Sequence, residues 1–381
     1  MSGPPDLLHV PQTAVIRTSD RGSFKGCRRR HGFSSHLHMN LEPKQQASPL
    51  WFGTGMHFAW EDMYSQDRRK YDTPGEAFSA YVRATLKQGR STLPDDWKDL
   101  HEMGLAMLNY YTEYWLIGRD ALTTYEVDGE PQVEINFLVD LPFNVKEHFP
   151  DSPYDNVMYS GTIDRIIIDD LGLLWLVDYK TAKTLKQSHF ANDPQVSAYC
   201  WAAYHIYQRP IGGMIYWQFL KVIPKPPEPL VSGKISTAKN QRTSHRMYRE
   251  ALLKAYDTII ASPKENVDFL NRLAMLESED QDPYIRRDKI YKNQASLEAE
   301  GAKILLELED MLNPHLPRYP NPTFMCPHMC PFYEVCVSMD DGSEWEEQLE
   351  AETQQRGEKD ESWRVHLEPT PSNGDIEKDF E

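Results

Sequence analysis

The sequence contains no apolar run that approaches the roughly 20 residues needed to cross a bilayer, so we expect no membrane-spanning helix and no membrane partner. The first residues, MSGPPDLLHVPQTAVIRTSD, include no apolar segment of the kind that forms the centre of a secretory signal. Only five cysteines occur among 381 residues, too few to staple a chain of this size with disulfides. We therefore expect a cytoplasmic protein whose cysteines are reduced and available for metal binding or chemistry.

Two further absences narrow the class of protein. We find no internal repeat and no P-loop pattern, so the chain is not an NTP-driven motor. What remains is an ordinary globular composition, with 40% hydrophobic and 26% charged residues. The length allows one large domain or two ordinary ones, each with enough residues for a hydrophobic core.

Acidic residues are concentrated at the C-terminal end. The segment 340–381 holds 15 acidic and 4 basic residues, which is −11 of the total net charge of −17. We expect 338–381 to be a disordered acidic tail, either a solubilising end or a binding segment for a protein partner. Local basic runs near Arg28 and Arg246 leave nucleic acid open as a partner, bound through a local groove and metal ions.

Apolar periodicity predicts an α/β protein with a small mixed sheet flanked by helices. The clearest strand signal is a hairpin over 157–168 and 173–180, turning at Asp-Asp-Leu-Gly. The other predicted elements are helices at 52–64, 74–87, 95–117, 194–207, 240–261 and 288–312, strands at 122–127, 133–139 and 214–222, and irregular segments at 1–16 and 318–336.

The hairpin carries a group of charged residues that suits hydrolytic chemistry. Alternate residues of a strand share a face, so Asp178 and Lys180 point the same way and Tyr179 points opposite. Asp164, on the preceding strand, is expected beside Asp178. Two carboxylates favour a hard divalent cation, and a lysine beside them can stabilise developing negative charge. The plainer interpretation is an exposed hairpin with a surface salt bridge.

Two flanking helices add residues to this group. Gln195 and Tyr199 are four positions apart on the helix that follows, so both can face the site and contact a phosphodiester backbone. Tyr199 is also compatible with a packed core position. His57, just after the small residues that open the predicted helix at 52–64, is a candidate metal ligand. Its alternative is a structural histidine paired with Glu61.

A cluster of cysteines near the C-terminus indicates a second metal centre. Cys326, Cys330 and Cys336 form a C-x3-C-x5-C pattern, and three grouped thiols in a reducing compartment favour a soft metal. Cys27 is available as a fourth ligand, and Cys200 lies within an apolar helix pattern and is expected in the core. Zinc and a [4Fe-4S] cluster both accept four thiolates.

Taken in their order along the chain, these motifs resemble those of the RecB-like branch of the PD-(D/E)XK nuclease superfamily. The resemblance runs from about residue 18 to 336. Within that branch, the chain is similar to the iron–sulfur members related to CRISPR-associated exonucleases and helicase-nuclease subunits, including stand-alone phage versions. We expect the nuclease domain to cover 17–337. The matching residues are His57, Asp164, Asp178, Lys180, Gln195, Tyr199, Cys27, Cys326, Cys330 and Cys336.

The resemblance implies a PD-(D/E)XK restriction-endonuclease-like core with helical insertions and a Cys-ligated cluster. It implies cleavage of DNA with Mg2+ or Mn2+ held by His57, Asp164, Asp178 and the carbonyl of Tyr179. Lys180 would then orient the attacking water or stabilise the transition state, while Gln195 and Tyr199 position the strand.

The four matching cysteines would bind a [4Fe-4S] cluster, with structural Zn2+ as the alternative. Many relatives have two residues between the first pair of the C-terminal cysteines, and here there are three.

The resemblance favours an exonuclease acting on single-stranded DNA ends in recombination, repair or phage DNA processing, in the host cytoplasm if phage-encoded. A homo-oligomer is left open. A competing hypothesis is a non-catalytic DNA-binding or scaffolding protein on a nuclease fold. Another is a zinc-stabilised interaction protein whose acidic tail binds a basic partner.

Overall fold

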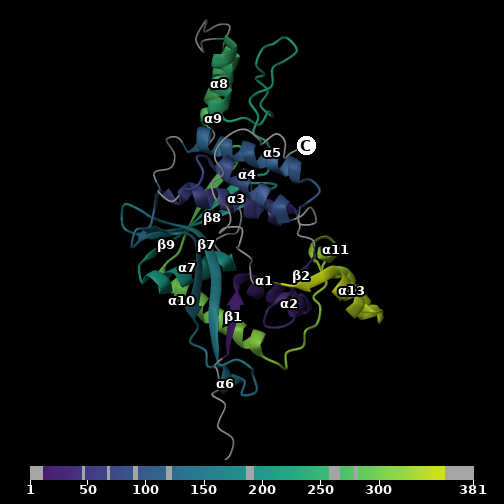
Figure 1. The fold of residues 1–381 in the computed structure, drawn as a ribbon. Helices are drawn as coiled ribbons and strands as arrows, with labels where there is room; N and C mark the ends of the chain where they lie inside the picture. The colour runs from purple at the N-terminus through teal and green to yellow at the C-terminus, as the bar shows by residue number, and fades with distance from the viewer. Residues whose placement is uncertain are drawn as a thin grey trace, which may run out of the picture.

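The structure is a computed structural model, and it describes residues 12–44, 48–66, 69–88, 93–116, 122–185, 193–256, 267–278 and 282–356. At its centre lies a seven-stranded mixed sheet with helices on both faces (Figure 1). The strands in the main path of the sheet are, in spatial order, β1 (Thr13–Arg17), β7 (Asn156–Ile168), β8 (Leu174–Ala182), β9 (Ile211–Leu220) and β10 (Ile285–Tyr291).

The expected hairpin is the middle of this sheet. Strands β7 and β8 pair antiparallel, and the Asp169 carboxylate closes their turn by accepting the amides of Leu171 and Leu173. Gly172 has a φ of 78°, a conformation that favours glycine. Strands β3 (Thr123–Thr124) and β6 (Val133–Asp140) pair with β7 along its length.

Strand β8 is buried on both faces, which explains its unbroken apolar run. Trp175, Val177 and Tyr179 pack into one hydrophobic core, whereas Leu174 and Leu176 pack into the core on the opposite face. The first core includes side chains of three helices, α3 (Ser48–Tyr64), α4 (Pro74–Gln88) and α5 (Trp97–Tyr110), and of the π-helical turn η3 (Tyr111–Trp115) that continues α5.

The second core lies under α7 (Pro194–Tyr207) and α10 (Gln294–Leu312). Helix α7 is the crossover between β8 and β9, which run parallel and therefore need a long connection. Helices α7 and α10 approach closely because Gly301 of α10 has no side chain: a Cβ there would lie 2.6 Å from Nε1 of Trp201. This helix pair positions the candidate site residues of α7.

Segments near the two ends of the described chain, 18–43 and 326–355, meet in a small unit beside the sheet (Figure 1). Strand β2 (Leu41–Pro43) pairs with β11 (Thr353–Gln355), and a separate apolar cluster joins Phe33, Phe332 and Leu349. The helices of this unit are α1 (Thr18–Gly26), α2 (Arg28–Ser34), α11 (Cys326–Met329), α12 (Tyr333–Asp341) and α13 (Trp345–Glu352).

The remaining elements are peripheral. Helices α8 (His245–Tyr256) and α9 (Val267–Ser278) form an arm with its own small apolar cluster, which projects beyond the layer of α4 and α5 (Figure 1). Strands β4 (Glu126–Val127) and β5 (Glu130–Pro131) form a two-stranded ribbon, and α6 (Val145–His148) is a single turn. None of the described helices has the length and apolar character needed to span a membrane.

The mixed α/β architecture agrees with the prediction from sequence; among the segments that differ from it, four differ most. Residues 13–16 are not irregular, because they form most of β1, which adds a parallel edge strand to β7. Residues 288–291 belong to β10 and not to a helix. The prediction was wrong because charged residues in this edge strand interrupt the alternation of apolar and polar residues. The segment 318–336 contains α11 and the start of α12.

The fourth difference concerns the acidic tail. We expected disorder from 338 onward, yet the chain is folded as far as 356, because Trp345 and Leu349 supply the apolar contacts of α13. The rest of the expected tail, 357–381, lies outside the described residues, as do 257–261 of the expected helix 240–261.

Candidate metal centre and its surroundings

Asp164 and Asp178 lie opposite each other where the β7–β8 ladder ends. The last ladder pair is Arg165 with Val177, so the next position on each strand is an aspartate. In place of a ladder bond, Asp164 Oδ2 accepts the Tyr179 amide at 2.7 Å. The hairpin therefore brings the two carboxylates together, as the sequence predicted.

Lys180 and Gln195 both contact one oxygen of Asp178. Lys180 Nζ lies 2.8 Å from Asp178 Oδ1, and Gln195 Nε2 lies 3.4 Å from the same atom. Burial lowers the pKa of Lys180, but the charges of Asp178 and Asp164 outweigh this effect and raise the pKa above its usual value. Lys180 is therefore a cation held against the carboxylates.

The other oxygen of Asp178 makes no such contact. Asp178 Oδ2 is buried and has no hydrogen-bond partner among the described residues. Burial and the neighbouring charge of Asp164 raise the pKa of Asp178, the charge of Lys180 lowers it, and the net result is a pKa of about 6. A buried carboxylate oxygen without a partner is costly, and a bound cation would satisfy it.

His57 and Glu134 complete the acidic group. His57 Nδ1 lies 3.1 Å from Glu134 Oε1 and 3.5 Å from Asp164 Oδ1. Ligand atoms of these three residues all lie within 4.8 Å of one another, and no other such group occurs in the described part of the chain. Burial lowers the His57 pKa, but Asp164 and Glu134 raise it to about 9. His57 lies within α3 and not at its start, because the helix begins at Ser48.

Glu134 was missed by the sequence analysis. It follows Val133 in β6, and the pairs on either side, Val133 with Arg165 and Ile135 with Ile163, place it opposite Asp164. Its φ of 48° is unusual for a strand residue other than glycine. Such strain commonly marks a functional site. An acidic residue in the strand pattern 133–139 was visible in the sequence, but the pairing with β7 was not.

Helix α7 presents Gln195 and Tyr199 toward this site. Asp193 caps the helix by accepting the Gln195 amide at 2.8 Å, which sets the start of α7. Tyr199 is half-buried against the Phe137 ring, with centroids 5.5 Å apart. Burial raises its pKa, Lys180 lowers it, and Asp178 raises it. Tyr199 is thus both a packing residue and a neighbour of the charged group.

The Tyr179 side chain points away from the carboxylates, as strand alternation predicted. Its ring stacks on Trp60 at 4.9 Å and lies in the core, while its hydroxyl accepts from Arg165. The tyrosine therefore anchors β8 beneath the site and offers only its backbone to the charged face.

The cysteines also come together, in the unit formed by the two chain ends. Cys27 lies between α1 and α2, and its sulfur accepts the Asn321 amide at 3.4 Å. Burial raises the pKa of Cys330; the neighbouring Cys27 and Cys326 raise it further. The sulfur of Cys336 accepts from Arg29, two residues after Cys27.

These thiols are not placed for a single small ion. All are free, and no three of the sulfurs lie within 4.8 Å of one another. Cys200 is fully buried in the second core, as expected.

Comparisons with known proteins give a family match and similar solved structures. One solved structure, described as "Crystal structure of SSO0001", has 14% sequence identity and a TM-score of 0.31; the match covers 87% of this chain and 89% of that one. A search of curated proteins found no match. The family model described as the PD-(D/E)XK nuclease superfamily matches residues 19–337. That range includes the carboxylates, the lysine and the four clustered cysteines, and this chain belongs to the PD-(D/E)XK nuclease superfamily.

Proposed function

We propose that the protein is a metal-dependent deoxyribonuclease that acts as an exonuclease on single-stranded DNA ends. Members of this superfamily are generally nucleases that use divalent metals such as Mg2+ or Mn2+. The observation that carries the proposal is Asp178, whose Oδ1 is paired with Lys180 while its buried Oδ2 has no partner. With one oxygen paired and the other unpaired, this carboxylate can contact a catalytic lysine and a metal cation at the same time.

The residues present fit a hard divalent ion. His57, Glu134, Asp164 and Asp178 offer one imidazole and three carboxylates, and the Tyr179 carbonyl is a further oxygen. Oxygen-rich sets of this kind suit Mg2+ and Mn2+. A bound ion supplies Lewis acidity that polarises a phosphoryl oxygen.

The chain's own side chains then perform the remaining work. Lys180 stays protonated beside Asp178 and can donate a hydrogen bond to the attacking water or to the phosphoryl oxygens as negative charge develops. Gln195 holds Asp178 from the other side and has further hydrogen-bonding capacity for a strand. Tyr199, packed on Phe137, offers a hydroxyl from a rigid position. These contacts would orient a phosphodiester for in-line attack.

We propose that Cys27, Cys326, Cys330 and Cys336 hold a [4Fe-4S] cluster rather than zinc. Tetrahedral zinc with Zn–S bonds of about 2.3 Å requires sulfurs about 3.8 Å apart. No three of the described sulfurs lie within 4.8 Å of one another, whereas a zinc site of this kind would bring all four within that distance. A larger cluster would join the two chain ends beside the nuclease core.

A cleavage assay tests the proposed activity. Full-length protein purified without oxygen is incubated with end-labelled single- and double-stranded DNA and Mn2+ or Mg2+. Metal-dependent shortening from the ends of single strands is expected, and Lys180→Ala should abolish it. The matched control is Lys183→Ala, which removes the next lysine along the chain at an exposed position. A folded, metal-loaded wild type as inactive as Lys180→Ala would replace this proposal with the non-catalytic DNA-binding function.

The acidic tail requires a separate deletion. Removing residues from 340 onward would also remove α13 and β11, and β11 pairs with β2. A truncation after 356 leaves that unit intact. The nuclease proposal predicts that this truncated protein cleaves DNA as well as the full-length protein does. If the tail recruits a protein partner, the truncated protein should still cleave DNA but no longer bind that partner.

A further inference from the structure

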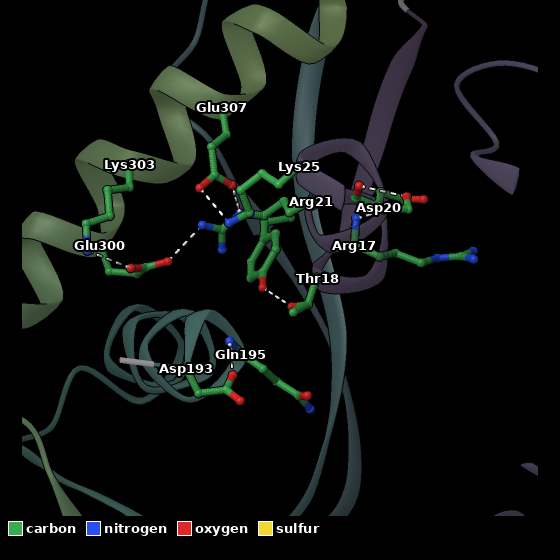
Figure 2. Close-up of polar contacts among 12 residues, drawn as sticks. Arg17, Thr18, Asp20, Arg21, Lys25, Asp193, Gln195, Glu300, Lys303 and Glu307 are labelled. Carbon is green, nitrogen blue, oxygen red and sulfur yellow. Dashed lines mark hydrogen bonds and ion pairs between the residues drawn. The ribbon is translucent and has the colours of Figure 1, made fainter. Parts of the chain in front are cut away.

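A cavity lies between α1, α7 and α10. It has a volume of about 480 Å³, within the range of about 300–1,000 Å³ typical of small-molecule sites. Figure 2 shows the ion pairs that Arg21, Lys25 and Lys303 form with Glu300 and Glu307 at this cavity. Side chains of α1, of the first turn of α7, and of α10 with the turn before it line the cavity.

Arg21 provides an unused hydrogen-bond donor at this cavity. Its side chain is 1% exposed, and it donates to Glu300 at 2.8 Å and to Glu307 at 2.6 Å. Its third nitrogen, Nη1, is buried and has no hydrogen-bond partner among the described residues. Figure 2 shows the guanidinium between α10 and α7, with that nitrogen turned toward α7. A buried guanidinium nitrogen without an acceptor is costly, and an oxyanion would satisfy it.

The lining carries an excess of positive charge. Four of its side chains are basic and two are acidic, although the protein as a whole has a net charge of −17. Lys25 pairs with Glu307 at 2.8 Å and Lys303 with Glu300 at 3.6 Å, so the acids are already neutralised. Lys292 donates to Ser197 at 2.8 Å and brings a further cation to the rim. A negatively charged ligand in this cavity would therefore not be repelled by an unpaired carboxylate.

Two helix N-termini also face the cavity. Pro194 and Ser197 come from the first turn of α7, and Ser296 comes from the first turn of α10. The N-terminal end of a helix carries partial positive charge, and two such ends favour an anion. The Ser197 hydroxyl accepts from Lys292 and keeps its own proton for a phosphoryl oxygen, whereas the Ser296 hydroxyl donates to the Asn293 carbonyl.

We propose that this cavity is a phosphate-binding site that accepts a phosphate monoester or inorganic phosphate. Gln195, between the lining residues Pro194 and Ser197, contacts Asp178 of the metal centre. The first turn of α7 therefore connects the two sites. The phosphate site stands independently of the proposed function, whereas its use for the terminal phosphate of a DNA strand rests on that function.

Calorimetric titration of the full-length protein with inorganic phosphate and with deoxyadenosine 5′-monophosphate tests the site. Both should bind, and Lys292→Gln/Lys303→Gln should weaken binding by about tenfold or more, because charged hydrogen bonds are lost. The control, Lys98→Gln/Lys225→Gln, removes the same charge at exposed positions outside the cavity and should bind as wild type. Arg21 is left intact, since removing it would leave Glu300 buried without a cation.

The source of the phosphate is tested with oligodeoxynucleotides that carry a phosphate or a hydroxyl at either end. Binding is measured in Lys180→Ala protein, with and without the two cavity substitutions. A preference for one phosphorylated end that disappears with those substitutions supports the strand end as the ligand. Binding of the small phosphates alone supports a free nucleotide or phosphate instead. If neither class binds in a lysine-dependent way, the inference is wrong, even where metal-dependent cleavage is observed; if the site binds and cleavage fails, only the proposed function falls.

Discussion

His57 Nδ1 and Glu134 Oε1 lie 3.1 Å apart, although 77 positions separate the two residues along the chain. The contact joins α3 to β6 across the end of the β7–β8 hairpin, next to Asp164. It adds a carboxylate to the group that the sequence motifs identified. In our interpretation Glu134 is a metal ligand and not merely the partner of a histidine.

Glu134→Gln should weaken Mn2+ binding by more than about tenfold, since loss of even an outer-shell partner of a metal site costs about 10- to 100-fold in affinity or activity. The amide keeps the size of the side chain but removes its charge. Mn2+ affinity is measured by calorimetry, together with the cleavage rate. Glu126→Gln, at an exposed position of β4, is the matched control and should bind Mn2+ as wild type. Unchanged affinity in Glu134→Gln would leave Glu134 as a structural partner of His57.

The sequence predicted part of the site because strand alternation acts over short distances. Asp178 and Lys180 share a face in any strand, and Asp164 follows from the hairpin, so all three could be placed without a structure. Glu134 could not be placed this way, because its position depends on β6 pairing with β7 about 30 residues further along the chain. Long-range pairing of this kind leaves no local pattern.

The same limit explains the errors in the fold. Edge strand β10 carries Arg286, Arg287, Asp288 and Lys289, and only its pairing with β9 shows that these residues are extended. The acidic segment after 338 has a composition typical of disorder. Trp345 and Leu349 nevertheless fold it, because Phe33 and Phe332 supply an apolar surface from elsewhere in the chain.

Gly161→Ala should destabilise the protein by about 1–3 kcal/mol, the usual cost of overpacking a core. A Cβ at this position of β7 would lie 2.7 Å from a ring carbon of Phe137 and 2.9 Å from a ring carbon of Tyr199. The clash would also displace Tyr199 and lower the cleavage rate. Urea unfolding and cleavage kinetics measure the two effects.

Gly22→Ala is the control for this substitution. It adds the same methyl group within α1, where nothing lies within 4 Å of the new Cβ. Because alanine is favoured over glycine inside helices, we expect unchanged or slightly increased stability. Equal stability of Gly161→Ala and wild type would contradict the tight packing described at Tyr199.

The cysteine cluster gives a prediction independent of cleavage. Protein purified without oxygen should contain iron and acid-labile sulfide, and Cys330→Ser should lose both because a thiolate ligand is removed. Cys200→Ala should retain them, since Cys200 is buried in the core under α7. Elemental analysis that finds zinc and no iron in the wild type would overturn the [4Fe-4S] assignment.

Acid should destabilise the unit of the chain ends through His31. Its ring is buried between Phe24 and His38, at centroid distances of 5.2 and 5.1 Å. Burial, together with the nearby charges of His38, Arg318 and His36, lowers the pKa of His31 to about 3. This value lies below the usual pKa of about 6.5 in an unfolded chain. The unfolded state therefore takes up a proton below that pH while the folded state does not.

Stability should accordingly fall as the pH decreases from about 6.5 toward 3, and His31 alone accounts for a loss of about 2 kcal/mol by pH 5. His31→Phe replaces the imidazole with an apolar ring and should remove this part of the pH dependence. Urea unfolding at pH 7.5 and pH 5 measures the difference in unfolding free energy for each protein. His315→Gln, at an exposed position, controls for the loss of a histidine. If His31→Phe lost as much stability on acidification as wild type, another group facing this unit, such as His36 beside Asp20, would have to be responsible.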